Sequence, residues 1–207
     1  VDIKLIQGDC LEKMQDIPDG SIDAIITDPP YGTTACKWDV VIPFDKLWEQ
    51  YKRVIKSNGA IVLFGSEPFS SNLRMSNIKE FKYDWIWNKK LAGNAILAKH
   101  QPLKIHEIVS IFSNGKHTYN PIMWKGNKNH GSKDGVSFQK YLNRVSIYPA
   151  NTSDMKYPGT IIKADSLDPK SYIHPTQKPV ALYEYLIKTY TNEGETVLDN
   201  CMGSGTT

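Results

Sequence analysis

The sequence predicts an α/β protein built on a doubly wound, mostly parallel sheet. Short apolar runs, typical of buried strands, alternate along the chain with segments whose apolar residues recur at helical spacing. A late apolar run at 197–198 leads into the glycine-rich turn Gly203-Ser204-Gly205. At the carboxyl edge of such a sheet, a glycine turn after a strand is where a nucleotide-like cofactor usually binds. The 207 residues are enough for one such core together with an inserted segment.

The first half of the chain contains five expected elements. In order, they are a strand at 3–6, a short helix over 11–17, a strand over 24–27, a helix over 44–55 and a strand over 60–64. The helices rest on apolar residues three or four positions apart. We expect the turn signals Pro18-Asp19-Gly20 and Asn58-Gly59 to end them. The continuous apolar run at 60–64 is typical of a strand that is buried on both faces.

The second half is expected to contain two strands, a helix and a final strand, at 84–87, 107–112, 180–190 and 197–198. Between residues 114 and 170 the alternation breaks, and the sequence becomes polar and rich in turn residues. A loop of that length inside a compact domain is usually functional or disordered. We therefore divide the chain into a first core segment at 1–113, an insertion at 114–170 and a second core segment at 171–207.

The composition excludes several classes of protein. No apolar run is long enough for a membrane span, and no signal-peptide pattern opens the chain, so we expect a cytoplasmic protein without a membrane partner. Cys10, Cys36 and Cys201 lack the spacing of metal ligands or of a disulfide framework, so we expect no metal. A net charge of +3 permits binding to nucleic acid without arguing for it.

The two ends of the sequence lead us to expect a longer natural protein. The chain starts at Val1 instead of Met, and it stops within the glycine-rich turn. A cofactor-binding turn normally leads into a helix whose N-terminus faces the ligand. Since no such segment follows Thr207, we expect the sequence to be truncated at its C-terminus.

The segment Asp28-Pro29-Pro30-Tyr31 follows the strand expected at 24–27. At a strand exit these residues can hold a planar amine, because the acid and a backbone carbonyl accept its N–H groups and the ring stacks on the heterocycle. The prolines fix the turn. As alternatives, Asp28 could cap a turn, since Asp-Pro is common in turns, and Tyr31 could pack at the strand end. Together with the glycine turn, the segment favours group transfer to an exocyclic amine.

These motifs resemble those of the amino-methylating DNA methyltransferases. The resemblance extends from Gly8 to Thr207 and is strengthened by the segment His174-Pro175-Thr176-Gln177-Lys178-Pro179, which precedes the glycine strand. Because the Asp-Pro-Pro-Tyr segment comes before the glycine turn, the order is similar to that of the permuted β class. The resemblance implies a circularly permuted, Rossmann-like methyltransferase fold that uses S-adenosylmethionine.

By this resemblance, the chain would transfer a methyl group from S-adenosylmethionine to an exocyclic amine of a DNA base. Asp28 would accept the amine hydrogens together with the carbonyl of Pro29, and Pro30 would fix the turn. Tyr31 would stack on a base that has left the double helix. Asp28 favours adenine N6 as the acceptor, because cytosine-N4 enzymes of this group more often carry Ser at that position.

The resemblance also assigns residues to the cofactor. They are Asp9, Cys10, Lys178, Pro179, Asp199, Asn200, Cys201, Gly203, Ser204 and Gly205. The family commonly has an aromatic residue where this chain has Cys201. Three alternatives stay open: Asp9 as the N-cap of a helix, His174 as a turn residue, and the glycine turn as a surface loop. Trp38 could either wall the same pocket or pack in the core.

The expected partner is double-stranded DNA, from which the target base is flipped out of the helix. The expected setting is a restriction-modification system or a solitary methyltransferase of a bacterium or phage. A cognate restriction nuclease and a second copy of the chain, as a homodimer, are further partner candidates. Basic residues interleaved with aromatic ones make the insertion at 114–170 a candidate target-recognition region. The alternative is a solvated, flexible insertion, with sequence specificity coming from loops near Trp38 or Lys89-Lys90. Alternative functions are cytosine-N4 or RNA amino-methylation and a catalytically silent DNA-binding subunit.

Overall fold

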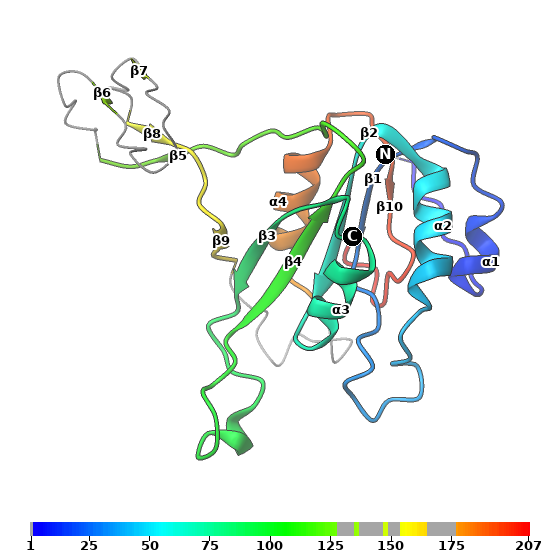
Figure 1. Cartoon of the computed structure of the whole chain (residues 1–207), viewed down its shortest axis with the longest axis horizontal. Helices are drawn as coiled ribbons and strands as arrows, with labels where there is room; N and C mark the ends of the chain where they lie inside the picture. The colour runs from blue at the N-terminus through cyan, green and yellow to red at the C-terminus, as the bar shows by residue number, and fades with distance from the viewer. Residues whose placement is uncertain (1, 128–134, 137–146, 149–153, 165–176) are drawn as a thin grey trace. The chain divides into compact units, whose positions relative to one another are not determined.

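The computed structural model describes residues 2–127, 135–136, 147–148, 154–164 and 177–207 (Figure 1). His174, Pro175 and Thr176 and parts of the insertion predicted at 114–170 lie outside these ranges. The chain separates into two units. The larger one consists of Val1–Asn120 and Thr160–Thr207, and the smaller one is Pro121–Gly159.

Within the described ranges, the larger unit contains a central sheet and the helices that cover it. Its strands are β1 (Ile22–Thr27), β2 (Ile55–Gly65), β3 (Phe81–Asn88), β4 (His106–Phe112), β9 (Ile161–Ile162) and β10 (Val197–Leu198). Its helices are α1 (Cys10–Met14), α2 (Phe44–Val54), α3 (Phe69–Ser76), α4 (Val180–Tyr190) and the 3-10 helix η1 (Ala95–Leu97).

The described residues of the smaller unit form two short antiparallel strand pairs. β5 (Trp124–Lys125) pairs with β8 (Met155–Lys156), and β6 (Gly135–Val136) pairs with β7 (Ile147–Tyr148). The indole N–H of Trp124 donates a hydrogen bond to the carbonyl of Tyr157 at 3.2 Å, which adds a side-chain contact to the first pair. Both pairs fall within the insertion that the sequence predicts at 114–170.

The central sheet is mostly parallel, as predicted. Its strands follow the order β10-β1-β2-β4-β3-β9. Neighbouring strands are parallel from β10 through β1 to β2 and again between β3 and β9, whereas β4 is antiparallel to both β2 and β3. Among the described strands of this sheet, therefore, all run in one direction except β4.

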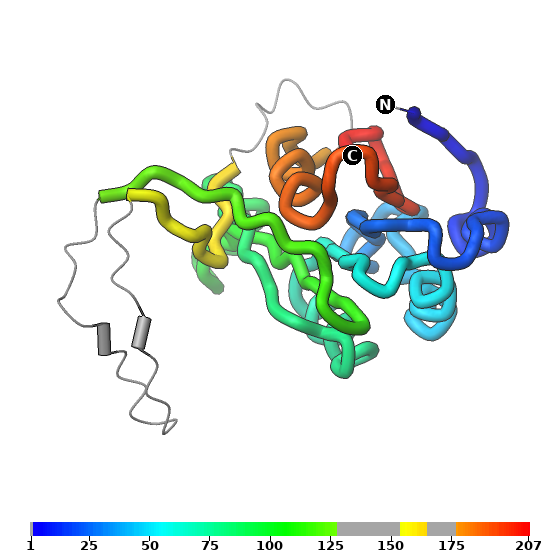
Figure 2. Tube along the Cα trace, turned by 90° about the horizontal axis from the view of Figure 1, so that it is seen from above, coloured from blue at the N-terminus to red at the C-terminus, as the bar shows by residue number. Residues whose placement is uncertain are grey.

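Helices cover both faces of this sheet, so the predicted doubly wound architecture is confirmed. α4 packs on one face, and α1, α2 and α3 pack on the other (Figures 1 and 2). Side chains alternate between the faces of a strand, and Ile26 accordingly belongs to the cluster under α4 while its neighbour Ile25 belongs to the cluster under α2. Both side chains are fully buried.

The strand expected at 3–6 is wrong. The segment has no regular secondary structure and pairs with no strand in the described part of the chain. Ile3 and Leu5 are 75% and 71% exposed. An apolar run becomes a strand only where a neighbouring strand can take up its backbone N–H and C=O groups, and β1 already has β10 and β2 on its two sides.

The end expected for the second helix is also wrong. α2 ends at Val54, Ile55 already adopts an extended conformation, and Asn58-Gly59 lies inside β2. The pairing of β1 with β2 changes register here, since Ile22 faces Ile55 but Ala24 faces Ala60. A Cβ atom on Gly59 would lie 2.8 Å from the carbonyl oxygen of Asp23. This glycine therefore allows a close approach of two strands and does not cap a helix.

The described helices are short. α2 and α4 have 11 residues each, and α3 has 8. A helix needs about 20 predominantly apolar residues to cross the hydrocarbon core of a membrane. No helix in the described ranges has the length and apolar character that such a crossing requires.

Leu182→Ala is expected to destabilise the protein by about 2–5 kcal/mol, because it removes buried methyl groups and leaves a cavity under α4. Leu182 is fully buried in the cluster that joins this helix to the sheet. Val180→Ala, on the same helix, is the matched control, since Val180 is exposed and its loss should cost less than about 0.5 kcal/mol. Denaturant unfolding measures both, and equal losses would contradict this packing.

Candidate functional site

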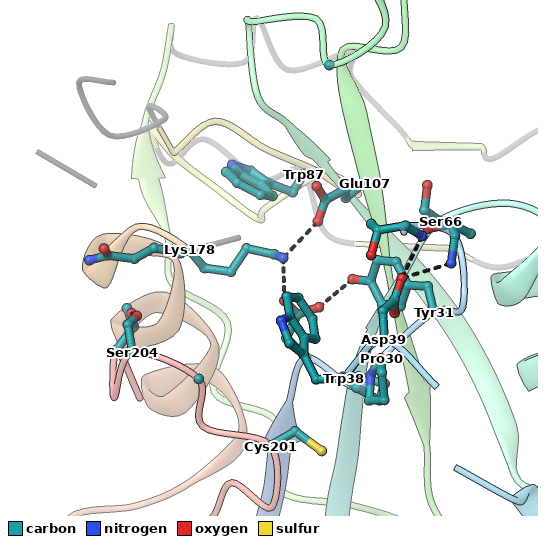
Figure 3. Close-up of a pocket in the computed structure, with 18 of the residues that line it drawn as sticks. Pro30, Tyr31, Trp38, Asp39, Ser66, Trp87, Glu107, Lys178, Cys201 and Ser204 are labelled. Carbon is teal, nitrogen blue, oxygen red and sulfur yellow. Dashed lines mark hydrogen bonds and ion pairs between the residues drawn. The ribbon is translucent and has the colours of Figure 1, made fainter. Parts of the chain in front are cut away.

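A cleft of about 950 Å³ opens at the carboxyl edge of the sheet (Figure 3). Its lining comes from the ends of many elements: Asp28 after β1, Ser66 after β2, Trp87 in β3, Glu107 in β4, Lys178 before α4 and Cys201 after β10. Because β4 is antiparallel to its neighbours, its first residues lie at the same edge as the last residues of β2 and β3. This edge is the usual place for a ligand in an open α/β sheet.

Both carboxylate oxygens of Asp28 are engaged by side chains of the cleft. The hydroxyl of Tyr31 donates a hydrogen bond to Oδ1. The ammonium of Lys178 donates to Oδ2 at 2.5 Å. The carboxylate is therefore fixed in orientation from two directions, immediately after the last residue of β1.

Lys178 connects Asp28 to a second carboxylate. Its Nζ atom lies 3.2 Å from Oε2 of Glu107, and Nζ of Lys89 lies 3.0 Å from the other oxygen of that glutamate. The side chain of Lys178 is only 7% exposed, and its Nζ lies 5.4 Å from the ring centroid of Phe64. The charged groups thus alternate in sign in the order Lys89, Glu107, Lys178 and Asp28. Within the described ranges, no group of three or more His, Cys, Asp or Glu side chains could hold a metal ion.

The pKa directions of this network follow from its geometry. Burial opposes the charge on Lys178, but Asp28 and Glu107 outweigh burial and raise its pKa above the usual value. Burial likewise opposes the charge on Glu107, but Lys178 and Lys89 outweigh it and lower its pKa. Both groups are therefore charged at neutral pH, and Lys178 holds a full positive charge against Asp28.

Tyr31 lines the cleft and also packs against the core. Its ring stacks on Phe69 at a centroid distance of 5.0 Å and an interplanar angle of 28°. Burial, followed by the negative charge of Asp28, raises the pKa of the Tyr31 phenol well above its usual value. The phenol is therefore neutral at physiological pH and acts as the donor in its hydrogen bond to Asp28.

A short loop after Tyr31 is organised by Asp39. The buried carboxylate of Asp39 accepts hydrogen bonds from the backbone N–H groups of Gly32, Thr33 and Thr34 at 2.9, 2.9 and 2.7 Å. Burial opposes ionisation, but a hydrogen bond from the side chain of Thr34, together with these backbone hydrogen bonds, lowers the pKa of Asp39. Trp38, next to it, is 52% exposed and lines the cleft, so this tryptophan does not pack in the core.

The glycine turn forms another wall of the cleft. Cys201, Gly203 and Ser204 line it, and Gly203 adopts a left-handed conformation with φ of 53°. Asp199 faces the protein and holds the turn: its Oδ1 accepts hydrogen bonds from the hydroxyl of Thr27 at 2.6 Å and from the N–H of Cys201 at 3.0 Å. A neighbouring contact runs from the hydroxyl of Tyr51 to Asn200, at 2.7 Å.

Asp9 and Cys10 lie at the start of α1. Asp9 caps this helix, since its Oδ1 accepts hydrogen bonds from the N–H groups of Leu11 at 2.8 Å and Glu12 at 3.3 Å. Cys10 approaches the glycine turn, where its hydrogen bond with Cys201 lowers the pKa of the Cys10 thiol to about 6 and raises that of Cys201. The structure therefore shows Asp9 as the N-cap that the sequence left open.

Comparison with known proteins places this site in a family. A family model described as DNA methylase, named for N6 and N4 methylation, matches residues 22–207. This match covers most of the chain, including Asp28, Glu107, Lys178 and the glycine turn. The chain belongs to this DNA methylase family. Among curated relatives, the type II methyltransferase M.HpaI from Haemophilus parainfluenzae is 28% identical over 218 aligned residues. The match covers 100% of this chain and 65% of that relative, so the chain spans about two thirds of its length.

Solved structures share the fold of this chain. The M1.HpyAVI-SAM complex matches with a TM-score of 0.60 at 23% identity, over 97% of this chain and 84% of the other. The cytosine-N4-specific PvuII DNA methyltransferase matches with a TM-score of 0.60 at 16% identity, over 93% of this chain and 71% of the other. These likenesses confirm the predicted Rossmann-like fold.

The structure brings together the residues predicted for the amine and part of the set predicted for the cofactor. Asp28, Pro29, Pro30, Tyr31, Lys178, Cys201, Gly203 and Ser204 all line the cleft. Asp9, Cys10, Pro179, Asp199, Asn200 and Gly205 are not among its lining residues. The glycine turn is therefore part of the cleft wall, while Asp199 and Asn200 support it from behind. The roles assigned to these residues stay predictions.

Sequence reasoning did not assign Glu107 or Lys89 to the site, nor the neighbouring contact of Lys104 with Ser66. Glu107 had one usable signal, because it is an acidic residue at the start of a strand whose remaining residues are mostly apolar. A carboxylate that is mostly removed from water needs a partner of opposite charge. The partner could not be found from the sequence, since Lys178 lies 71 positions further along the chain.

Lys178→Met is expected to destabilise the fold by about 3 kcal/mol, because it leaves the mostly buried carboxylate of Asp28 without its cationic partner and leaves Glu107 with Lys89 alone. Lys188→Met is the matched control. Lys188 forms an exposed ion pair with Glu184 on α4, and the loss of such a pair should cost less than about 0.5 kcal/mol. Denaturant unfolding at neutral pH measures both, and equal losses would contradict the assigned role of Lys178 in the network.

Proposed function

We propose that this chain forms the catalytic core of an S-adenosylmethionine-dependent DNA methyltransferase that modifies an exocyclic amine, with adenine N6 favoured. One observation carries the proposal: the Asp28 carboxylate, fixed by Lys178 and Tyr31, lies in a cleft that is also lined by the glycine turn. Membership of the DNA methylase family supports it.

The cleft is suited to S-adenosylmethionine in size and in its lining. Its volume of about 950 Å³ is at the upper end of the range for pockets that bind small molecules. Gly203 presents backbone without a side chain, and Ser204 offers a hydroxyl beside it. We propose that Cys201, Gly203 and Ser204 contact this cofactor. The M1.HpyAVI structure, a SAM complex with the same fold, supports the choice of cofactor. When bound, the cofactor supplies an electrophilic methyl group.

Asp28 and the carbonyl of Pro29 would accept the two hydrogens of the target amine. This orients the nitrogen lone pair and stabilises the positive charge that develops on nitrogen during transfer. Because Lys178 and Tyr31 already donate to the carboxylate, Asp28 acts as an oriented acceptor more than as a strong base. Tyr31 and Trp38, both on the cleft wall, would contact the plane of the extruded base.

Cytosine N4 is the second candidate acceptor, because it presents the same amine chemistry. The solved PvuII enzyme is cytosine-N4-specific and shares the fold. Asp28, where cytosine enzymes more often carry Ser, is the residue that favours adenine. RNA amino-methylation and a silent DNA-binding role are disfavoured by the family match. A cognate nuclease and a second copy of the chain stay partner candidates.

In the natural protein, Asp28→Ala should lower the methylation rate on the order of 100-fold or more, since it removes a preorganised electrostatic partner of the transition state. Single-turnover transfer from isotope-labelled S-adenosylmethionine to genomic DNA measures the rate, and nucleoside analysis identifies the product. We expect N6-methyladenine in the parental reaction.

Asp16→Ala is the control for this experiment, because Asp16 is exposed and lies outside the cleft lining. Calorimetry should show that the affinity of the Asp28→Ala variant for S-adenosylmethionine stays within a few-fold of the parental affinity. Parental product that is 5-methylcytosine, or an Asp28 variant with more than half of the parental rate, would overturn the proposed function. N4-methylcytosine would keep the mechanism and change the acceptor.

We further propose that the insertion at 114–170 contributes target recognition. It includes a compact unit at Pro121–Gly159. In the described part of this unit, the exposed Trp124 donates a hydrogen bond to the carbonyl of Tyr157. Lys125 and Lys156 add positive charge suited to phosphates. Replacement of residues 121–159 by a glycine-serine linker should abolish preference among DNA sequences while cofactor binding persists. Unchanged preference in methylation mapping would contradict this assignment.

A further inference from the structure

The loop that joins β3 to β4, residues 89–105, has an unusual composition for a segment beside a cleft. It contains four lysines and one histidine, with no aspartate or glutamate. Its large aliphatic side chains are exposed to solvent: Leu91, Ile96, Leu97, Leu103 and Ile105. Figure 1 shows this loop as the green segment that carries η1 and extends away from the carboxyl end of β3. We call it the β3–β4 loop.

Ile96 is the extreme case, with 96% of its surface exposed. It lies in the middle of the 3-10 helix η1. Scattered exposed aliphatic residues are normal on protein surfaces, but this side chain has almost no contact with its own chain and lies among other exposed aliphatic residues of one loop. Folding gains nothing from an isoleucine in this place.

The loop is ordered by its own hydrogen bonds. Oδ1 of Asn94 accepts from the N–H of Lys104 at 2.7 Å, and Nδ2 of Asn94 donates to the carbonyl of Pro102 at 3.1 Å. Beyond η1, the N–H groups of His100 and Gln101 donate to the carbonyl of Leu97 at 2.9 and 3.0 Å. Asn94 thus closes the base of the loop, and Ile96 is presented on a structured turn.

The base of the loop is part of the cleft wall. Lys89, Gly93, Asn94 and Lys104 all line the cleft that contains Asp28. Lys89 is anchored to Glu107, and Lys104 to Ser66. Since both ends of the loop are fixed to the residues around Asp28, the exposed turn rises from the rim of the same cleft.

The charge of this loop and its exposed isoleucine indicate that the loop binds DNA. A segment that carries lysines and no acidic residue matches the phosphate backbone of DNA, whereas the centres of protein–protein interfaces are depleted in lysine. Proteins that open or bend duplex DNA insert isoleucine, leucine or similar apolar side chains between base steps, with lysine and arginine around them. An exposed isoleucine between Lys90 and Lys99 has this combination.

We propose that the β3–β4 loop binds the DNA duplex beside the target base and that Ile96 enters the base stack and fills the space that the extruded base leaves. Lys99, and Lys90 on the other side of η1, would contact phosphates. The inference rests on the proposed function, because it requires a base that leaves the helix to reach Asp28. It assigns the extrusion step to residues outside the Asp28 network.

The test uses single-turnover methylation by the natural protein on two duplexes that contain a mapped modification site. In one duplex the target base is paired, and in the other it faces an abasic site. Ile96→Ser should slow methylation of the paired duplex on the order of 10-fold, because extrusion loses its apolar filler. On the abasic duplex, where unpairing is already done, the rate should return to within about 2-fold of the parental rate.

Two matched controls come from the turn between α3 and β3. Ile78 and Lys79 are exposed and precede β3, at the opposite edge of the sheet from the cleft. Ile78→Ser should leave both rates unchanged. Lys99→Gln should weaken duplex binding for all sequences and reduce the salt dependence of affinity by about one unit of slope, whereas Lys79→Gln should change neither.

Each outcome decides between alternatives. If Ile96→Ser methylates the paired duplex at the parental rate, Ile96 does not enter the base stack and the inference is overturned. A reduced rate that is not restored on the abasic duplex overturns it as well. Sedimentation that shows Ile96→Ser converting a dimer to a monomer would assign the loop to a second copy of the chain and overturn the inference. No methylation by the parental protein would instead refute the proposed function, and the Lys99 binding measurement would still test the contact of the loop with DNA.

Discussion

The arrangement of the cleft depends on one buried ammonium group. Lys178 lies between Asp28 and Glu107, at 2.5 and 3.2 Å from their nearest oxygens, and only 7% of its side chain is exposed. Without it, two carboxylates at the same edge of the sheet would repel each other in a medium that screens charge poorly. Because Lys178 comes just before α4, this contact also fixes the start of α4 against the ends of β1 and β4, elements far apart in the sequence. The same interaction thus orients Asp28 and helps to place the start of α4, whose packing on the sheet comes from its apolar side chains.

Because β4 runs antiparallel to its neighbours, it adds residues from the start of a strand to a cleft that is otherwise lined mainly by residues at or after strand ends. In a fully parallel sheet the edge above Asp28 would be built only from loops that follow strands. Here β4 runs the other way, so its first residues, including Glu107, reach the same edge. The same reversal allows β3 and β4 to be joined by one loop at that edge, so the basic β3–β4 loop and the Asp28 network share a boundary. The fold thereby places charge compensation and the loop for which we propose a contact with DNA beside one carboxylate.

Periodicity predicted the elements whose side chains pack on the core. β1, the apolar part of β2, α2, α4 and β10 were all expected near their observed positions, because each buries a regular pattern. The strand predicted at 3–6 was wrong because an apolar run does not reveal whether a partner strand is available. The helix end predicted at Asn58-Gly59 was wrong because glycine occurs both after helices and where two strands approach closely. Asp28 could be predicted from four adjacent residues, whereas the partnership of Lys178 with Glu107 arises only in three dimensions.

The most direct test of this account is a double-mutant cycle between Asp28 and Lys178, measured as free energy of unfolding at neutral pH. Asp28→Asn and Lys178→Met are made singly and together, and each should destabilise the protein by itself. If Lys178 holds Asp28 as described, the double variant should be more stable than the sum of the single losses predicts, by at least about 1 kcal/mol. Losses that add within about 0.3–0.5 kcal/mol, as for residues without contact, would show that the two groups do not depend on each other and would contradict the account.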